Sequence, residues 1–392
     1  MCQLIGYRIP LTFKRAIRFS AYMNESSVYE VAIGLLPRVG SQLTRQLVSY
    51  CGSAKAVFST PVGKLEKIPG IGKGKIQNVL YPQVLKEAEA IVKQAEQQEV
   101  KLLFYTNPAY PDRLKTIPDA PTLLYFKGKC DFNVPKVISI VGTRNNTDYG
   151  KRITEQLVQD LIPYNPLIIS GLAYGIDITA HRAAVQHNLA TVGVMASGQD
   201  IIYPTAHKST AEKMLNHGGL LTENTFGTKP DAPRFPARNR IIAGISDCTI
   251  IVEANAKGGA LITADIADSY GKDVLAVPGN IDAVASAGCN YLIKSNKAHV
   301  YTSVNDLVEL LNWDLNTKPA ALNVLSESFD TSEYTPDEVA ILKVLAQTKE
   351  ELLDNLSWKT QLPVSRVASL LLQLEFKGAV KSLPGKKYQI SH

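Results

Sequence analysis

The chain has 392 residues, of which 45% are hydrophobic and 20% charged, a composition that excludes an intrinsically disordered protein and predicts two or three folded domains. The formal net charge is +6, but residues 1–133 carry +8, whereas residues 134–312 and 313–392 carry −1 each. The net charge of the whole chain hints at a polyanionic partner without identifying one. No stretch approaches the roughly 18 apolar residues of a membrane span.

Residues 1–22 contain four basic side chains and no acidic one. They lack the apolar core of a signal peptide, so we expect a disordered extension or a misassigned start, with a transit peptide as the alternative. Cysteines are widely spaced, at Cys2, Cys51, Cys130, Cys248 and Cys289. This spacing favours neither a zinc site nor a disulfide framework, so we expect a cytoplasmic protein without a metal.

Residues 23–97 are predicted to form a helical domain with a weakly repeated turn. The segment Leu36–Gly40 recurs 32 positions later as Ile68–Gly72. The second copy fits a helix-hairpin-helix turn, whose glycines expose amide groups that can bind phosphate. A structural turn and an auxiliary DNA contact remain equal alternatives, and the contact would use Gly70, Gly72, Lys73 and Lys75. The first copy has Arg38 where the second has Gly70, so we expect it to be structural.

A connecting segment rich in proline and tyrosine is expected at residues 98–133, and an α/β domain at residues 134–313. In this domain short β-branched runs alternate with amphipathic helical patterns, which is typical of a parallel sheet covered by helices. Seven strands are predicted, at Val137–Val141, Leu167–Ser170, Thr191–Met195, Gly219–Thr222, Thr249–Glu253, Val274–Val277 and His299–Tyr301.

The loop after the first of these strands argues against dinucleotide binding. A dinucleotide fold needs G-x-G-x-x-G there, but the chain has Gly142-Thr143-Arg144. We expect Arg144 to point its guanidinium into the crevice where open α/β sheets bind ligands. The backbone amides of the loop Ser170–Asp177 would lie beside it. A surface salt bridge is the alternative role for Arg144.

Residues 234–240 place three arginines, one aromatic ring and one amide side chain within seven positions. Guanidinium groups that clamp phosphates, together with a ring, Phe235, that stacks on a base, suit single-stranded nucleic acid. The alternative is a charged helix start with Phe235 in the core. A glycine-rich loop at 256–261 precedes a further helix and could line the same crevice.

Catalytic residues are hard to assemble from this sequence. Asp177 and His181 lie four positions apart, and we interpret them as a local helix-cap pair rather than a catalytic dyad. The sequence contains no motif of a serine hydrolase or a zinc peptidase. We therefore expect no enzymatic activity and no cofactor.

After a polar linker at residues 314–333, residues 334–392 are predicted to form a winged helix. Thr335-Pro336 and Glu338 offer a capping box, two more helical patterns follow, and Gly378 ends the last of them. A small hairpin is expected at Ala379–Leu383 and Lys387–Ile390. Duplex DNA binding through the last helix is one possible role. We favour a partner-binding or structural role, because only one basic side chain stands among its expected exposed positions, Ser365, Arg366, Ser369 and Gln373.

The ordered motifs of the chain resemble the DNA-processing protein A (DprA/Smf) family, from about Val28 to Leu311 and less closely beyond. The motifs that carry the resemblance are Gly142-x-Arg144 with Tyr149-Gly150, Ser170-Gly171-x-Ala173-x-Gly175-Ile176-Asp177 with His181, Tyr203-Pro204, Phe235-Pro236-x-Arg238-Asn239-Arg240, Gly259-x-Leu261-Ile262-Thr263-Ala264 and Val277-Pro278-Gly279.

The resemblance implies an α/β fold, with an extended Rossmann-like parallel-sheet domain between an N-terminal SAM-like or helix-hairpin-helix domain and a C-terminal winged helix. It also implies a cytosolic, non-enzymatic protein that binds and protects single-stranded DNA. Such a protein would dimerise through the Rossmann-like domain and load the RecA recombinase during natural transformation. Its DNA pocket would use Gly142, Arg144, Ser170, Gly171, Lys208, Phe235, Arg238, Asn239 and Arg240.

Three positions depart from the family pattern. Thr147 stands where serine is usual, Thr205 follows Tyr203-Pro204 in place of a basic residue, with Lys208 three residues on, and Gly258 replaces a serine. An enzyme of the nucleotide phosphoribohydrolase type, which shares this general sheet, is the alternative function. The closest match to the Pro-Gly-Gly loop of that enzyme type is Pro278-Gly279-Asn280, without a glutamate.

Overall fold

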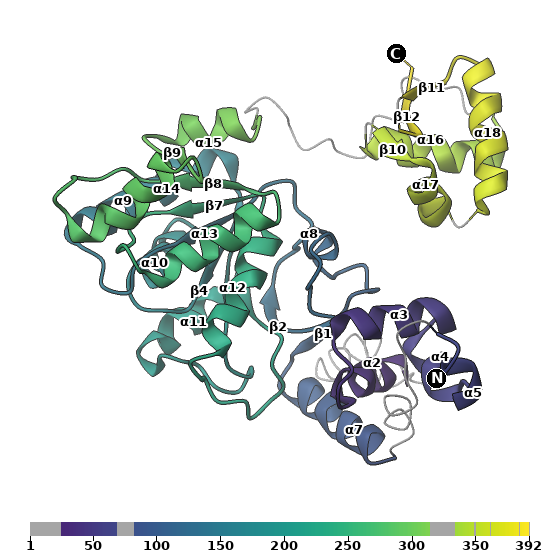
Figure 1. Ribbon diagram of the computed structural model, residues 1–392, viewed down its shortest axis with the longest axis horizontal. Coiled ribbons are helices and arrows are strands. Elements are labelled where there is room, and N and C mark those ends of the chain that lie inside the picture. Colours follow the sequence, from purple (N-terminus) through teal and green to yellow (C-terminus); the bar gives the residue numbers. More distant parts are fainter. Residues whose placement is uncertain are drawn as a thin grey trace, which may run out of the picture. The chain divides into compact units, whose positions relative to one another are not determined.

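In the computed structural model of the chain, the described residues are 25–68, 82–313, 334–348, 350–360, 362–383 and 385–391. They fall into two compact units, Met1–Trp313 and Asp314–His392 (Figure 1). The expected extension at 1–22, the expected linker at 314–333, and the auxiliary candidates Gly70, Gly72, Lys73 and Lys75 lie outside the described residues.

Within the described part of the first unit, nine strands form one sheet in the order β1-β2-β6-β5-β4-β3-β7-β8-β9. The strands from β6 to β9 pair in parallel, whereas β1 and β2 add an antiparallel edge. Their bounds are β1 Lys101–Phe104, β2 Leu123–Lys129, β3 Val137–Val141, β4 Leu167–Gly171, β5 Thr191–Val194, β6 Gly218–Thr222, β7 Cys248–Ile251, β8 Asp273–Ala276 and β9 His299–Val300. Each of the seven strands predicted from the sequence is present within about two residues of its expected bounds.

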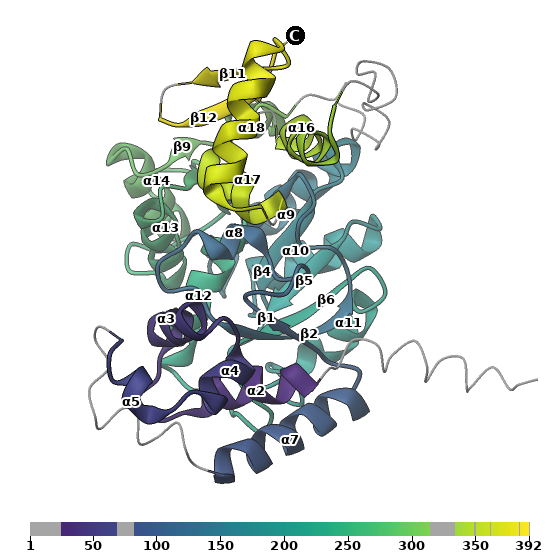
Figure 2. The same ribbon diagram turned by 90° about the vertical axis from the view of Figure 1, so that its right-hand side faces the viewer.

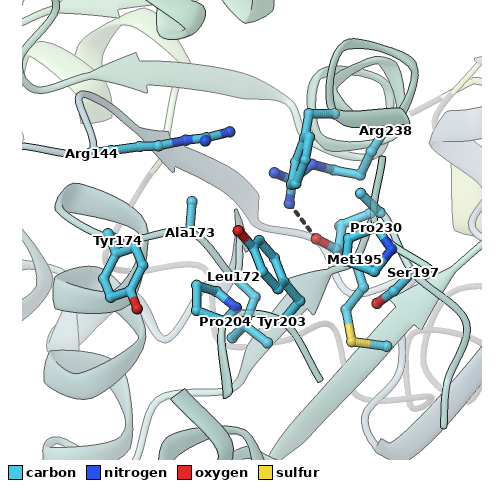
Figure 3. Close-up of a pocket in the computed structure, with 13 residues that line it drawn as sticks. Arg144, Leu172, Ala173, Tyr174, Met195, Ser197, Tyr203, Pro204, Pro230 and Arg238 are labelled. Carbon is cyan, nitrogen blue, oxygen red and sulfur yellow. Dashed lines mark hydrogen bonds between the residues drawn. The ribbon is translucent and has the colours of Figure 1, made fainter. Parts of the chain in front are cut away.

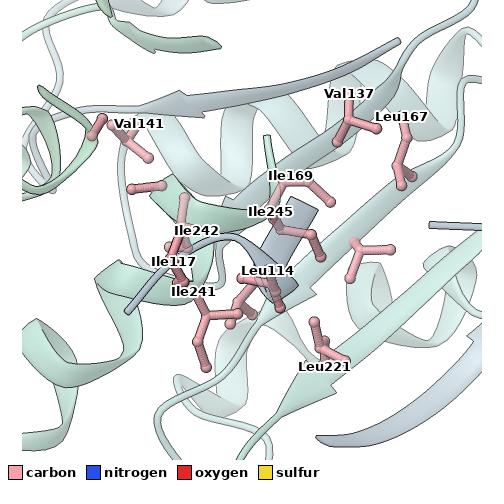
Figure 4. Packing of buried hydrophobic residues seen from close by; sticks show 14 of the residues in the cluster. Leu114, Ile117, Val137, Val141, Leu167, Ile169, Leu221, Ile241, Ile242 and Ile245 are labelled. Atoms are coloured by element: carbon pink, nitrogen blue, oxygen red, sulfur yellow. The ribbon is translucent and has the colours of Figure 1, made fainter. Parts of the chain in front are cut away.

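Helices cover both faces of this sheet because successive strand residues point to opposite sides. Val137 and Val141 of β3 pack with one helical layer, and Ile138 and Ile140 with the other (Figure 4 shows the first cluster). The first layer contains α8 Asp112–Lys115, α12 Arg234–Ile245, α13 Gly259–Ser269 and α14 Ala287–Lys294. The second contains α9 Asp148–Asp160, α10 Ile176–Gln186, α11 Lys208–Met214 and α15 Val304–Leu310. The sequence prediction of an α/β domain is confirmed.

The segment expected to connect two domains belongs to the main sheet instead. It supplies β1, β2 and α8, and it is fixed to the centre of the sheet by Arg113. The guanidinium of Arg113 donates to both carboxylate oxygens of Asp247, at 2.6 and 2.9 Å. Asp247 also accepts the backbone N–H of Val137, at the start of β3. The sequence did not predict β1 and β2, because this segment is rich in proline and tyrosine and its alternation of apolar and polar residues, which indicates a strand, is short.

Helices of the N-terminal region pack on the antiparallel edge of the sheet (Figure 2). Phe104 of β1 and Tyr125 of β2 are buried against them. In the first copy of the repeated turn, Arg38 has φ 62°, the left-handed conformation that favours glycine. Glycine is the residue at the matching position of the second copy. The described helices are α2 Glu25–Leu35, α3 Ser41–Cys51, α4 Ala54–Ser59, α5 Val62–Leu65 and α7 Pro82–Gln97.

The second unit is a small helical domain with a three-stranded sheet, in the order β10-β12-β11. Thr335 and Glu338 form the predicted capping box, since each backbone N–H donates to the side chain of the other. Gly378, at φ 70°, follows the last helix as expected. The elements are α16 Pro336–Thr348, β10 Glu350–Leu352, α17 Leu353–Thr360, α18 Val364–Phe376, β11 Val380–Leu383 and β12 Lys387–Ile390.

Candidate nucleic-acid interface

The candidate site lies where the strand order reverses. From β3 the chain adds β4, β5 and β6 on one side and later β7, β8 and β9 on the other, so a crevice opens between the carboxyl ends of β3 and β7. A groove of about 630 Å³ occupies this position. It is lined by the end of β3, the loop after β4, the start of α12 and the start of α13. A smaller pocket adjoins it (Figure 3).

Arg144 is the exposed cation of this groove. Its loop is held in place because the N–H of Thr143 donates to the carbonyl of Glu253 at 2.7 Å. Gly175, at φ 79°, packs against the same loop, and a Cβ there would lie 2.1 Å from the Thr143 carbonyl oxygen. The guanidinium of Arg144 lies over the ring of Phe235, 4.9 Å from its centroid. The contact with the Phe235 ring therefore orients the Arg144 side chain within the groove.

Phe235 has a different environment from the one expected for a base-stacking ring. It is half-buried, Arg144 covers it, and the ring of Tyr203 lies 6.1 Å away, centroid to centroid. The Phe235 ring therefore already has a cationic and an aromatic neighbour within the protein.

Arg238 is buried, with 6% of its surface exposed, at the bottom of the groove. Its Nη1 donates to the carbonyl of Val194, and its Nε donates to Oδ1 of Asn239. Asp177 faces Arg238 across Gly171, where a Cβ would lie 2.3 Å from Arg238 Nη1 and 2.4 Å from Asp177 Oδ2. Burial raises the pKa of Asp177 and lowers that of Arg238, while the attraction between them opposes both shifts.

The structure separates the remaining sequence candidates into three groups. Gly142 and Asn239 line the groove. Ser170 lies beneath it, fully buried, with its hydroxyl donating to the carbonyl of Ile140 at 2.6 Å. Arg240 and Lys208 are absent from the described lining. Arg240 forms ion pairs with Glu223 and Asp119, and Lys208 is exposed at the start of α11.

The hydrogen-bond partners of His181 are groups other than Asp177. Its Nδ1 lies 2.7 Å from the hydroxyl of Thr191, and its Nε2 lies 2.6 Å from the carbonyl oxygen of Gly171. The predicted helix-cap pair is therefore wrong, and a dyad is excluded because both ring nitrogens are engaged elsewhere. Burial lowers the pKa of His181 to about 4. His181 holds β4 and β5 together below the site.

The N-terminus of α9, where a dinucleotide fold places its pyrophosphate, already holds a carboxylate. Glu253, buried after β7, accepts the backbone N–H of Thr147 at 2.9 Å and its hydroxyl at 2.5 Å. A Cβ at Gly150 would lie 2.1 Å from the same carboxylate. Thr147 keeps the hydroxyl of the serine usual at this position. The carboxylate of Glu253 thus occupies the helix N-terminus that a pyrophosphate would need, which gives a physical reason why the glycine motif of dinucleotide-binding folds is absent.

Two tyrosines at the pocket were not among the sequence candidates. Tyr174 and Tyr203 are about half exposed, at 50% and 49%, and both line the pocket next to Arg144 (Figure 3). The signal available in the sequence was an aromatic residue inside each of two loops that follow strands, which by itself is weak.

Among the described residues, no group of three or more histidine, cysteine, aspartate or glutamate side chains is placed to hold a metal ion. Within the same residues, no helix is long and apolar enough to cross a membrane.

Comparison with known proteins gives one consistent result. A family model described as DNA recombination-mediator protein A matches residues 101–312, and a DprA winged helix domain matches residues 327–386. Protein Smf of Synechocystis is 32% identical, over 93% of this chain and 99% of the relative. DNA processing protein DprA of Streptococcus pneumoniae is 41% identical, over 51% of this chain and 70% of the relative.

Two solved structures are also similar. DNA processing protein A from Streptococcus pneumoniae has a TM-score of 0.61 and 32% identity, covering 73% of this chain and 98% of that one. The second is a structure of the single-stranded DNA binding mode of DNA processing protein A from Helicobacter pylori. It has a TM-score of 0.50 and 28% identity, covering 55% of this chain and 96% of that one.

Proposed function

The chain belongs to the DNA recombination-mediator protein A family, a family of DNA-processing proteins, and from this premise we propose that it binds single-stranded DNA in the groove between β3 and β7. It would protect the strand and load the RecA recombinase onto it during natural transformation, in the cytoplasm. The observation that carries this proposal is the exposed, oriented guanidinium of Arg144 in a groove of about 630 Å³.

The groove suits a strand rather than one small anion. It is open, and α12 and α13 both begin at it, so their first backbone N–H groups add partial positive charge. Asp177 and Asp231 also line it, and their carboxylates limit the positive potential. Binding therefore depends on where the strand places its phosphates, and base identity matters little.

We assign the candidate residues different roles within this proposal. Arg144, Asn239 and the backbone around Gly142 would contact DNA, because they line the groove. Arg238, Ser170 and Gly171 would position the floor, because they are buried. Arg240 would act only through the structure of α12, since it is ion-paired with Glu223. We also propose a binding rather than a catalytic role, since both ring nitrogens of His181 are engaged by Thr191 and Gly171.

Fluorescence anisotropy with labelled oligothymidine tests the site. Wild type should bind with a log–log salt slope of about −0.7 per phosphate contacted. Arg144→Ala should weaken binding and make the slope less steep by about one such contact, because it removes a phosphate partner. Arg182→Ala, an exposed arginine of α10 outside the lining, is the control and should change neither quantity. Unchanged binding by Arg144→Ala would contradict the assignment.

We further propose that a second copy of the chain docks on the last βαβ unit. Ile281 and Val284, before α14, are 88% and 74% exposed, and Tyr291 on α14 is 56% exposed. The edge strand β9 lies in the same unit with Val300 exposed. Exposed apolar side chains beside an open strand edge are costly in a monomer and favourable in an interface.

Sedimentation velocity tests this contact. Wild type should sediment as a dimer at micromolar concentration, and Tyr291→Asp should raise the dissociation constant by about tenfold or more, since it places a charge in an apolar interface. Tyr50→Asp, on an exposed tyrosine of the helical region, should remain dimeric. Equal masses for wild type and Tyr291→Asp would rule out this surface.

A further inference from the structure

Exposed aromatic rings gather at the small pocket beside Arg144. Among the described residues, four tyrosines are about half exposed or more: Tyr50, Tyr174, Tyr203 and Tyr291. Two of them, Tyr174 and Tyr203, line this one pocket although they come from different loops, after β4 and before α11. Figure 3 shows the two rings on either side of Ala173, with Arg144 nearby.

Each of the two rings is held from behind. Tyr174 packs on His207, with ring centroids 4.7 Å apart and ring planes at 72°. His207 is itself buried and bonded through Nδ1 to the carbonyl oxygen of Leu172, at 2.9 Å. Tyr203 packs on Phe235. Each ring is therefore supported by a neighbouring ring while Tyr174 and Tyr203 stay about half exposed, so ordering them on binding would cost little entropy.

The pocket behind the rings is too small to enclose a nucleotide, at about 30 Å³. A base at this pocket would therefore lie over the exposed tyrosine rings at its mouth. Phe235 is less able to serve in this way, because the guanidinium of Arg144 lies 4.9 Å from its centroid. Arg144 lines the same pocket as Tyr203, so the cation would be available to a phosphate next to a base stacked there.

We propose that Tyr174 and Tyr203 form the base-stacking platform of this site, with Phe235 as the support for Arg144. The platform takes unpaired nucleobases of any sequence, since every base presents a π-face. The inference rests on the proposed function of single-strand binding and adds to it a contribution from bases that is independent of phosphate charge.

An abasic oligomer with the same length and backbone charge as oligothymidine isolates this contribution. Wild type should bind oligothymidine more tightly than the abasic oligomer. Tyr174→Leu and Tyr203→Leu should each weaken oligothymidine binding by about five- to tenfold or more, as expected for the loss of a stacked base, and leave abasic binding unchanged. Tyr174→Phe and Tyr203→Phe keep the ring and should restore affinity. Tyr50→Leu is the matched control at an exposed tyrosine outside the pocket.

Photo-crosslinking of wild type to an oligomer that carries 5-iodouracil gives a second measurement, which needs no variant to fold. Crosslinks mapped to Tyr174 or Tyr203 support the platform, and crosslinks confined to Phe235 overturn it. Equal wild-type affinity for oligothymidine and the abasic oligomer also overturns it, while leaving the proposed function intact. If wild type binds neither oligomer, the proposed function itself fails.

Discussion

Arginines that look equivalent in the sequence have different environments in the fold. Arg234, at the start of α12, is exposed and donates to Asn224 Oδ1 at 3.0 Å. Arg238, one turn later, is buried against the carbonyl of Val194, and Arg240 is ion-paired with Glu223. Arg144, from a separate loop, is exposed in the groove. Burial thus separates a residue proposed to contact DNA from one proposed to position the floor, since a buried guanidinium without its partners would cost several kcal/mol.

The buried histidine makes stability depend on pH. Burial holds the folded-state pKa of His181 at about 4, below the ordinary value of 6.5. The unfolded chain therefore binds this proton first, and stability is lost as pH falls from 6.5 towards 4, by about 1.4 kcal/mol per pH unit.

Denaturant unfolding of wild type and His181→Gln at several pH values measures this effect. The stability difference between the two proteins should shrink as pH falls through that range. Taking the difference cancels the contributions of other titratable groups to the pH dependence of stability. These include Asp177, whose raised pKa makes stability increase as pH falls. A stability difference that does not vary with pH would count against the neutral, buried histidine.

At the scale of elements, similar helix starts are used differently. The N-terminus of α9 is closed by the carboxylate of Glu253, whereas those of α12 and α13 lie at the groove. In the winged helix, the four positions of α18 expected to be exposed are exposed, but Arg366 forms an ion pair with Asp337 at 3.1 Å. The same helix exposes three large apolar side chains, Val364, Leu372 and Phe376. Since Arg366 is the basic side chain of α18 and is ion-paired, this helix presents no unpaired cation, which a helix that reads DNA bases would need.

The winged helix is therefore expected to contribute little to DNA affinity. Ending the chain at Trp313, the last residue of the first compact unit, should change oligothymidine affinity by less than about threefold, because no phosphate contact is lost. Arg366→Ala in the full chain should leave duplex affinity unchanged. Anisotropy with single-stranded and duplex oligomers measures both, and a duplex affinity that depends on Arg366 would restore the alternative of major-groove binding.

For the whole molecule, the excess of positive charge and the candidate binding site lie in different segments of the sequence. Residues 134–312, which contain the groove, carry −1, whereas four of the six net positive charges lie in residues 1–22. DNA binding at the groove, as proposed, would depend on charges within a Debye length of about 10 Å, so the local placement of Arg144 would outweigh the total.

Deleting residues 1–22 checks this directly. The shortened chain should bind oligothymidine within about threefold of wild type at 0.15 M salt, while Arg144→Ala in the intact chain should lose more, because Arg144 lines the groove. Anisotropy on the three proteins at two salt concentrations is sufficient. A larger loss from the deletion than from Arg144→Ala would place the main DNA contact elsewhere.

The sequence by itself determined the α/β class, the positions of seven strands, the winged helix with its capping box, and the placement of Arg144 in the loop after β3, because hydrophobic periodicity and turn residues are local signals. Only the tertiary structure decided that segment 98–133 joins the sheet, that Arg238 and Ser170 lie beneath the groove, and that Tyr174 and Tyr203 line one pocket with Arg144. These outcomes depend on which residues distant in sequence become neighbours, and on how much water each side chain keeps. Packing sets both, and no local pattern encodes them.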